Sequence, residues 1–478
     1  MPVKAPILVL KFGGTSVAGP VEIRRVADIV VDAGRGGGRL VVVVSAMSKV
    51  TDGLIDSMRR AVAGHIDGSH DVLNGLLERH RRAAQELLGP DNRPRFEAVL
   101  DEASGNLADL LRVMGRHPGT RRALEDEIVA HGEHLSSWLL ALALREQGLP
   151  AVWVDARTVI RTNDQHGRAA PLADAIRKAA LEFLEPRIAA GQIPVLGGFI
   201  GSCAQGATTT LGRGGSDFSG ALVGAALRNA EIQIWTDVSG FLTADPRVVP
   251  DARVIPHLSY AEAAELAYFG AKVLHPRTIL PAVEMGLPVR ICNSREPEGS
   301  GTRIDGRREV SVQGIKAIAH KRGITVVQVT AARMLGTYGF LRALFEVFER
   351  HQTSVDIVTT SEVSVSLTIE DTSALPRIVT DLQELGDVSA EGGYAIVCTV
   401  GEGLRNTPGV AGRVFGALGS TKTVLISQGA STTNLTFVVR DEDVEGVVAR
   451  LHDRFFGAPQ SNAGFPEQSA APDKGCPA

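Results

Sequence analysis

TTTLGRGGSD, residues 208–217, joins a short β-branched run to a long segment rich in Ala, Leu and Gly. Its closely spaced glycines let the backbone approach a ligand and adopt positive φ without strain. We expect residues 217–229 to form a helix capped by Ser216, so that the loop presents free backbone N–H groups to an anion. Arg213 adds a guanidinium suited to a carboxylate or a phosphate. Asp217, in the first turn, is either a structural carboxylate at the helix start or a catalytic group.

The N-terminus supplies a second glycine loop of similar design. Ile7–Leu10 is an apolar run typical of a buried strand, and it leads into Lys11, Phe12, Gly13 and Gly14. A lysine and two glycines at a strand end are a suitable layout for a phosphate site. The chain contains neither the G-x-x-x-x-G-K-[ST] phosphate loop nor a G-x-G-x-x-G dinucleotide motif after a strand.

Composition excludes several classes of protein. A chain of 478 residues is expected to form two or three domains, and its 44% hydrophobic and 22% charged residues are typical of a globular protein. The net charge of −4 gives no electrostatic case for binding nucleic acid or an anionic membrane. No apolar run approaches the roughly 20 residues of a membrane span, and the N-terminal apolar run is too short for a signal peptide. The four cysteines are far apart, so we expect free thiols in a cytoplasmic protein.

Strands alternate with helices over roughly the first 300 residues, which predicts an α/β domain with a mostly parallel sheet covered by helices. A stretch rich in Pro, Gly and charge, 296–306, is expected to be a linker. The expected strands are 40–45, 151–155, 194–200, 232–236 and 287–293; the expected helices are 21–33, a block over 54–147 with breaks at 89–90 and 117–119, 261–267 and 271–274.

The C-terminal third contains an internal repeat of β-α-β-β-α, which predicts two ferredoxin-like modules in tandem. The last residues, 459–478, are rich in Pro, Ala and Ser and are expected to be disordered. The first unit comprises 324–329, 339–351, 354–359, 364–369 and 375–385; the second comprises 394–400, 409–418, 424–428, 435–439 and 443–451. We expect the preceding strand, 314–320, to belong to the second unit.

Four motifs in this order resemble the aspartokinases of the amino-acid kinase family: KFGGTSV from Lys11, TTTLGRGGSD, WTDVSG with TADPR after it, and FGAKVLHP. The resemblance extends to about Phe456, and the C-terminal part is most similar to the monofunctional, lysine-sensitive type. It implies a three-layer α/β/α sandwich followed by two ACT modules of βαββαβ topology. The implied boundaries are a catalytic domain at 1–298, a linker at 299–312, ACT modules at 313–457 and a tail at 458–478, with the first module (about 322–390) inserted in the second (about 313–321 plus 391–457).

The resemblance implies ATP-dependent phosphorylation of the side-chain carboxylate of L-aspartate, giving 4-phospho-L-aspartate and ADP at the start of lysine, threonine and methionine synthesis. Because both reactants are anionic, the catalyst must screen charge and align them. Lys11 is expected to stabilise the transferred phosphoryl group and Asp217 to orient Lys11. Arg213 is expected to bind the aspartate α-carboxylate and Glu133 its ammonium, with further contacts from Ser45, Thr51 and Ser216.

The implied cofactors are ATP and Mg²⁺, without a metal site made by the protein alone. The family usually has tyrosine where this chain has Leu242, which removes a hydroxyl and a ring. The ATP residues implied by the resemblance are Lys11, Phe12, Gly13, Gly14, Thr236, Asp237, Leu242, Arg247, Lys272 and Val273.

The resemblance also implies feedback inhibition by L-lysine and a homodimer formed through the ACT modules, or a tetramer. Two other hypotheses stay open at this point: a related kinase acting on glutamate or acetylglutamate, and an amino-acid-sensing protein without activity. The implied effector residues are Met334, Thr337, Gly339, Phe340, Leu341, Val355, Asp356, Ser361, Glu362 and Val363.

Overall fold

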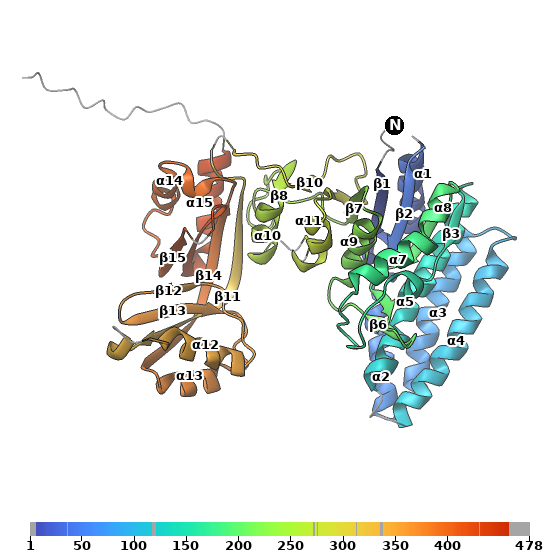
Figure 1. Ribbon diagram of the computed structural model, residues 1–478, viewed down its shortest axis with the longest axis horizontal. Helices are drawn as coiled ribbons and strands as arrows, with labels where there is room; N and C mark the ends of the chain where they lie inside the picture. The colour runs from blue at the N-terminus through green and yellow to red at the C-terminus, as the bar shows by residue number, and fades with distance from the viewer. Residues whose placement is uncertain are drawn as a thin grey trace, which may run out of the picture.

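An eight-stranded sheet organises the catalytic part of the chain, on the right of Figure 1. The computed structural model describes residues 6–35, 37–116, 121–270, 273–274, 276–311, 313–334, 338–429 and 431–457. All neighbouring strands are parallel except one antiparallel pair, β9 with β10. Across the sheet the order is β3 (Ala151–Trp153), β4 (Ile193–Gly197), β2 (Arg39–Val44), β1 (Ile7–Phe12), β7 (Ala230–Thr236), β9 (Val289–Asn293), β10 (Thr302–Asp305) and β8 (His257–Ser259).

Helices cover both faces of this sheet, because alternate residues of its central strands face opposite sides. In β2, Val41 and Val43 pack in one core, whereas Leu40, Val42 and Val44 pack in the other. The three-layer α/β/α sandwich is therefore confirmed. The second core is covered by α1 (Pro20–Gly34), α2 (Val50–Val62), α3 (Ile66–Leu87), α4 (Arg93–Arg116) and α5 (Arg121–Glu146); the first is covered mainly by α6 (Ala156–Val159), α7 (Ala173–Phe183), α8 (Glu185–Ala189), α9 (Gly215–Leu227), α10 (Tyr260–Tyr268) and α11 (Leu280–Glu284).

The C-terminal part, on the left of Figure 1, is built on a six-stranded antiparallel sheet with helices packed against it. Two strands of 14 residues, β11 and β14, lie at its centre and run through both repeat units. The order is β12 (Val358–Thr360), β13 (Ser364–Ile369), β11 (Ala317–Thr330), β14 (Asp387–Val400), β16 (Asn434–Arg440) and β15 (Leu425–Gln428). The helices are α12 (Phe340–Arg350), α13 (Leu375–Gln383), α14 (Val410–Ala417) and α15 (Val444–Phe456).

Shorter elements complete the fold. A two-stranded hairpin of β5 (Ile200–Ser202) and β6 (Thr208–Thr210) leads into the loop before α9. The 3₁₀ turns are η1 (Gly14–Val17), η3 (Pro276–Ile279), η4 (Ala332–Met334), η5 (Leu404–Asn406) and η6 (Asp441–Asp443). Within the described ranges, no helix combines the length and apolar character that a membrane span requires.

Three expectations from the sequence are corrected. Ser216 does not cap the helix: α9 begins at Gly215, and its N-cap is Gly214 in the left-handed conformation at φ 73°. The stretch 296–306 is not all linker, since β10 pairs within the catalytic sheet. The strands expected at 314–320 and 324–329 are one strand, β11, with a register shift between Lys321 and Ile324 that hides its continuity.

Smaller differences have local causes. The helical block also breaks at Gly64, whose positive φ of 83° ends α2 and was not recognised in the sequence. The break at 117–119, the first two residues of the helix expected at 271–274 and the tail at 458–478 lie outside the described residues, and Val273 and Leu274 are not helical. The three cysteines within the described ranges are buried free thiols.

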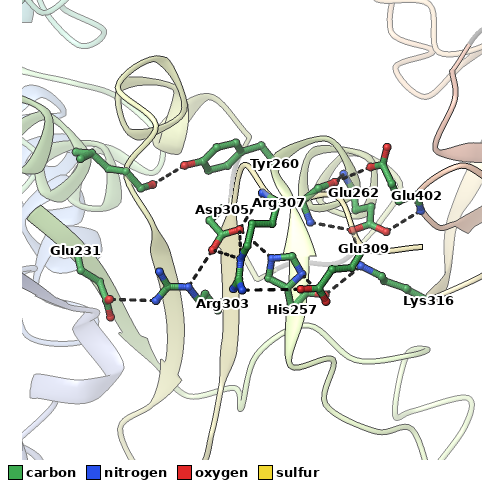
Figure 2. Close-up of polar contacts among 12 residues, drawn as sticks. Glu231, His257, Tyr260, Glu262, Arg303, Asp305, Arg307, Glu309, Lys316 and Glu402 are labelled. Atoms are coloured by element: carbon green, nitrogen blue, oxygen red, sulfur yellow. Dashed lines mark hydrogen bonds and ion pairs between the residues drawn. The ribbon is translucent and has the colours of Figure 1, made fainter. Parts of the chain in front are cut away.

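Ionic contacts join the catalytic domain to the ACT modules at the start of α10 (Figure 2). Glu262 is fully buried, and its carboxylate accepts from the Ser259 backbone N–H (2.8 Å) and from the Lys316 ammonium (3.0 Å). It also accepts from the backbone N–H of Glu402 at 2.7 Å. Since Lys316 precedes β11 and Glu402 follows β14, one buried carboxylate ties α10 to both long ACT strands.

A second ionic group lies beside the first in Figure 2 and is centred on Asp305 at the end of β10. Its carboxylate contacts His257 (2.9 Å), Arg303 (2.9 Å) and Arg307 (3.1 Å). Burial alone would raise the pKa of Asp305, but these hydrogen bonds outweigh burial and lower it. The group fixes the edge of the catalytic sheet just before the chain enters the ACT modules.

Candidate functional site

A cavity of about 640 Å³ opens at the carboxyl ends of β1 and β2, where ligands bind in open α/β sheets. Both glycine loops line it, together with the loop after β2 and the start of α2. The structure therefore brings together segments more than 150 residues apart. The expected residues that line this cavity are Lys11, Gly13, Gly14, Ser45, Thr51, Glu133, Arg213, Ser216, Asp217 and Thr236.

Lys11 and Asp217 form an ion pair at the centre of the cavity. The ammonium lies 2.5 Å from the Asp217 carboxylate, and the two side chains are only 8% and 18% exposed. Lys11 is the fifth residue of β1 and lies between Val43 and Ile234 of the neighbouring strands, so its backbone is held from both sides. The pair places a cation, with its orientation fixed, where an anionic reaction centre can meet it.

At Gly14 the first glycine loop passes so close to the loop after β2 that no side chain fits. A Cβ on Gly14 would lie 2.8 Å from the Ala46 carbonyl oxygen, and real Cβ atoms do not approach so near. The Ser48 backbone N–H donates to the Gly14 carbonyl at 3.1 Å, which links this loop to the one after β2. The loop thus presents bare backbone to the cavity, as phosphate binding requires.

Glu133, on α5, projects a buried carboxylate into the cavity. Its side chain is almost inaccessible, and Oε2 has no hydrogen-bond partner. Burial raises the pKa of Glu133 to about 8, although the Ala46 backbone N–H and the nearby Lys11 ammonium act in the opposite direction. A buried acceptor without a partner is costly, so a cationic donor placed beside Oε2 would be favoured.

The remaining substrate candidates surround this carboxylate. Arg213 is exposed on the second loop and lines the same cavity as Glu133. Ser45 follows β2, and its carbonyl accepts from the Ser136 hydroxyl at 2.8 Å. Thr51 lies in the first turn of α2, and Ser216 in the first turn of α9. One cation and three hydroxyl groups therefore accompany the buried Glu133.

The expected ATP residues divide between two cavities. Thr236 and the first glycine loop line the main one, whereas Leu242, Arg247 and Val273 line a second of about 240 Å³. The wall of the second cavity includes Ile318, Ala319 and His320 of β11, so an ACT strand forms one side of it.

Other expected ATP residues take different places. Phe12 is fully buried and stacks on Trp235, with ring centroids 6.0 Å apart, so only its backbone can reach a ligand. Asp237 is exposed and accepts from the Thr236 hydroxyl at 3.3 Å. Lys272 lies outside the described residues.

Two histidines beside Glu133 do not face the main cavity. His131 Nδ1 lies 2.9 Å from the Glu127 carbonyl oxygen, and the His134 ring packs edge-on against Trp153. Both line a separate hollow of about 110 Å³, and burial lowers the pKa of each. Among the described residues no group of three or more His, Cys, Asp and Glu side chains could hold a metal ion.

The expected effector residues fall at two ends of one sheet. Met334, Gly339 and Phe340 lie around the start of α12, and the Val363 carbonyl joins that end by accepting from the Ala331 N–H at 2.8 Å. Leu341 is exposed in the first turn of α12; Ser361 and Glu362 belong to the turn that carries Val363. Thr337 is outside the described residues.

Val355 and Asp356 lie at the opposite end. The Asp356 N–H donates to the Thr368 carbonyl, four residues along the chain from the turn that ends at Ser364. At about 3.3 Å per residue, roughly 13 Å of strand separates these positions. One chain therefore does not bring Asp356 and Glu362 together as a pair of acids.

Some residues of these sites were missed in the sequence. Lys49 lines the main cavity in a left-handed conformation, φ 64°, which a lysine rarely adopts. The polar loop after the strand at 40–45 was the available signal. Tyr268, Lys321 and Glu370 surround Asp356, and no local pattern indicates this because they come from three separate elements.

The fold is an α/β domain whose two glycine loops surround a cavity, with an attached pair of ferredoxin-like modules. Comparisons with known proteins agree. Residues 6–293 match the model of the amino acid kinase family, and residues 397–455 match an ACT domain. The chain is 39% identical over 464 residues to lysine-sensitive aspartokinase 3 of Escherichia coli K12, covering 94% of this chain and 99% of that protein.

Solved structures give the same result. The E. coli aspartokinase III complex with aspartate and ADP (R-state) matches with a TM-score of 0.77, and the complex with lysine and aspartate (T-state) with 0.79. Both are 39% identical to this chain and cover 94% of it, with 100% and 99% of their own chains matched. The chain belongs to the amino acid kinase family, and within it to the aspartokinases.

Proposed function

We propose that this protein is an aspartate kinase, which transfers the γ-phosphoryl group of ATP to the side-chain carboxylate of L-aspartate. The observation that carries the proposal is the main cavity, where the Lys11–Asp217 pair and the buried, unpartnered Glu133 face the same space. A relative of similar length has been solved with aspartate and ADP bound, which supports the same pair of ligands here.

Each charged residue of the main cavity is assigned to one charged group of the substrates. Aspartate carries an ammonium and two carboxylates; Glu133 binds the ammonium and Arg213 the α-carboxylate, which turns the side-chain carboxylate toward Lys11. Lys11 stabilises the charge of the transferring phosphoryl group, and Asp217 fixes its ammonium in place. The nucleophile is already ionised at neutral pH, so no general base is needed. The oxygen of the aspartate carboxylate forms a bond to phosphorus as the bond to ADP breaks.

ATP would lie across the two cavities. Its phosphates would meet the backbone N–H groups of Gly13, Gly14 and the second glycine loop, and its base and ribose the hollow lined by Leu242 and Val273. Mg²⁺ fits this donor set, because it commonly uses one or two carboxylates plus substrate phosphates and needs no protein cluster. Asp217, which lines the main cavity beside Lys11, would be the carboxylate that holds Mg²⁺, and the ion would supply further charge neutralisation.

The substrate is tested by measuring ADP release from the purified chain with aspartate, glutamate and acetylglutamate in turn. We expect a rate with aspartate at least about a hundredfold above the others, because acetylglutamate lacks the ammonium that Glu133 would bind and the extra methylene of glutamate would move its side-chain carboxylate out of line with Lys11. Equal or greater activity with glutamate or acetylglutamate would indicate a sister kinase. No ADP release with any of them would indicate an inactive sensing protein.

We infer that two copies associate through their ACT modules. The edge strands β12 and β15 expose Val358 and Ile426; Val363 and Val424, next to these strands in the chain, and Phe345 on α12 are also exposed. Apolar side chains on a sheet edge favour pairing with another chain. Because one chain keeps Asp356 and Glu362 apart, the two acids can act together only across such an interface.

We propose L-lysine as the inhibitory effector. A relative is named for its lysine sensitivity, and its structure has been solved with lysine and aspartate. In this chain Asp356 offers a buried acceptor without a hydrogen-bond partner, and Glu362 an exposed carboxylate. Two acids suit the two ammonium groups of lysine, whereas threonine and methionine carry one.

The effector assignment is tested by titrating activity with lysine, threonine and methionine. Lysine alone is expected to inhibit, and Asp356→Ala is expected to raise the half-inhibitory concentration at least about tenfold, as losing a charge-assisted hydrogen bond would. Asp371→Ala, an exposed aspartate of the same module, is the matched control. A wild-type enzyme insensitive to lysine, or unchanged inhibition in Asp356→Ala, would exclude this assignment.

A further inference from the structure

The Lys321 ammonium occupies a site built from three side chains. It lies 3.1 Å from Asp356 Oδ1 and 2.8 Å from Glu370 Oε2, and 5.2 Å from the centre of the Tyr268 ring. Two carboxylates and an aromatic face are a suitable environment for a primary ammonium. The Lys321 side chain is only 17% exposed and the Asp356 side chain is buried, whereas Glu370 is exposed, so the site is closed on the Asp356 side and open to solvent on the Glu370 side.

Asp356 has spare capacity in this site. Its side chain is 4% exposed, and Oδ1 accepts both from Lys321 and from the Tyr268 hydroxyl at 2.6 Å. Oδ2 is buried and has no hydrogen-bond partner. A buried carboxylate oxygen left unpaired is costly, so a further donor placed there is favoured.

We propose that these side chains form an ammonium subsite of the effector site, which Lys321 fills until the ammonium of an amino-acid effector replaces it. The proposal rests on the proposed regulation by lysine and extends it, since it gives the site a competitor carried by the chain itself. Lysine and Lys321 present the same –NH₃⁺ group, and a single ammonium fits between Asp356 and Glu370.

Tyr268 gives this exchange a route to the catalytic domain. It is the last residue of α10, which is anchored to the ACT strands at its other end through Glu262. Just beyond it, a Cβ on Gly270 would lie 2.1 Å from the His320 carbonyl oxygen, so the backbones of this loop and of β11 touch. Gly270 and His320 both line the cavity assigned to the ATP base.

An effector ammonium at Asp356 would therefore act on two contacts at once. An effector ammonium that takes the place of Lys321 between Asp356 and Glu370 can also donate to the free Oδ2, which draws the Asp356 carboxylate away from the Tyr268 hydroxyl on Oδ1. A shift of α10 against β11 changes the wall of the base cavity. Regulation then follows because lysine binds the rearranged form more tightly than the form shown here.

The test is isothermal titration calorimetry of L-lysine with the full chain, comparing wild type with Lys321→Gln and Lys321→Arg. If Lys321 competes, Lys321→Gln binds lysine about tenfold more tightly and is inhibited at lower lysine concentrations. Lys321→Arg keeps the competing charge and stays near wild type. Lys422→Gln, an exposed lysine of the second ACT module, is the matched control, and the rate without lysine monitors folding.

The outcomes separate this proposal from the assignment of the effector. Lysine binding to wild type with equal or weaker binding to Lys321→Gln would overturn the competition and leave the effector assignment intact. Binding to Lys321→Gln but not to wild type would support it even without inhibition of wild type. If lysine bound neither wild type nor Lys321→Gln while both were active kinases, the effector assignment and the subsite would both be wrong, and the proposed kinase activity would stand.

Tyr268→Phe provides the second readout, because it removes one hydroxyl and keeps the ring. We expect its lysine dissociation constant to stay within about threefold of wild type, while the maximal inhibition at saturating lysine falls. A merely structural role would lower the melting temperature without separating binding from inhibition. Full inhibition with unchanged affinity would show that the Tyr268 hydroxyl does not transmit the signal.

Discussion

Lys11→Met is expected to lower kcat by about two to three orders of magnitude, the usual scale of losing one preorganised electrostatic contact with a transition state. The methionine fits the space of a side chain that is only 8% exposed, so the fold should survive. KM for aspartate should change little, since Lys11 is assigned to the phosphoryl group rather than to the amino acid. The measurement is steady-state kinetics with both substrates varied.

Three variants make this result specific. Lys178→Met alters an exposed lysine on α7 and should keep the wild-type rate. Arg213→Ala should raise KM for aspartate about tenfold and leave kcat nearly intact, because it binds a group that does not react. In Lys11→Met the Asp217 carboxylate loses its ionic partner, and the double variant Lys11→Met/Asp217→Asn removes that unpaired charge. If the double variant recovered activity, Lys11 would serve only to neutralise Asp217. A near-normal kcat in Lys11→Met would contradict the role of Lys11 in stabilising the transferring phosphoryl group.

Glu133→Gln is expected to raise KM for aspartate about 10- to 100-fold at pH 8, the scale of one lost hydrogen bond between charged groups. The sign of the pH effect follows from the raised pKa. Below about pH 8 the Glu133 carboxyl is mostly protonated and cannot pair with the ammonium. KM for aspartate in wild type should therefore fall as pH rises from 6 to 8, by up to about tenfold per unit, and then level off.

The glutamine variant should lack this pH dependence, and Glu182→Gln, an exposed glutamate on α7, should keep it. Stability gives an independent check. Because the folded pKa of Glu133 lies above the ordinary 4.5, the stability contributed by its neutral form is complete below pH 4.5 and is lost as pH rises through 8. Melting temperatures of wild type should thus fall relative to Glu133→Gln over this range. Parallel pH profiles of KM in the two proteins would contradict the role of Glu133.

The sequence was most informative where local pattern and chemistry coincide. The two glycine loops and Lys11 could be placed at strand ends because periodicity, glycine spacing and a charge agree there, and β13 matches its expected range of 364–369 residue for residue. The pairing of Lys11 with Asp217, by contrast, depends on strand order, which no local pattern encodes. The same holds for Lys321, Asp356 and Tyr268, which meet only after two domains have packed.

The errors have physical causes. Gly214 caps α9 in place of Ser216 because a glycine in the left-handed conformation starts the helix two positions earlier. The stretch 296–306 resembles a linker in composition, yet β10 is a strand because its pairing with β9 and β8 outweighs weak propensity.

The two long ACT strands determine how the regulatory part unfolds. Residues 317–324 of β11 pair with residues 394–400 of β14, and residues 326–330 pair with residues 387–391, so each strand belongs to both repeat units. Neither unit can melt without removing the pairing partner of the other. The tandem should consequently lose its structure in one cooperative transition, with hydrogen exchange equally slow in both halves of β11 and β14. Cleavage of the polypeptide between the two ACT repeat units would therefore not yield two fragments that fold independently.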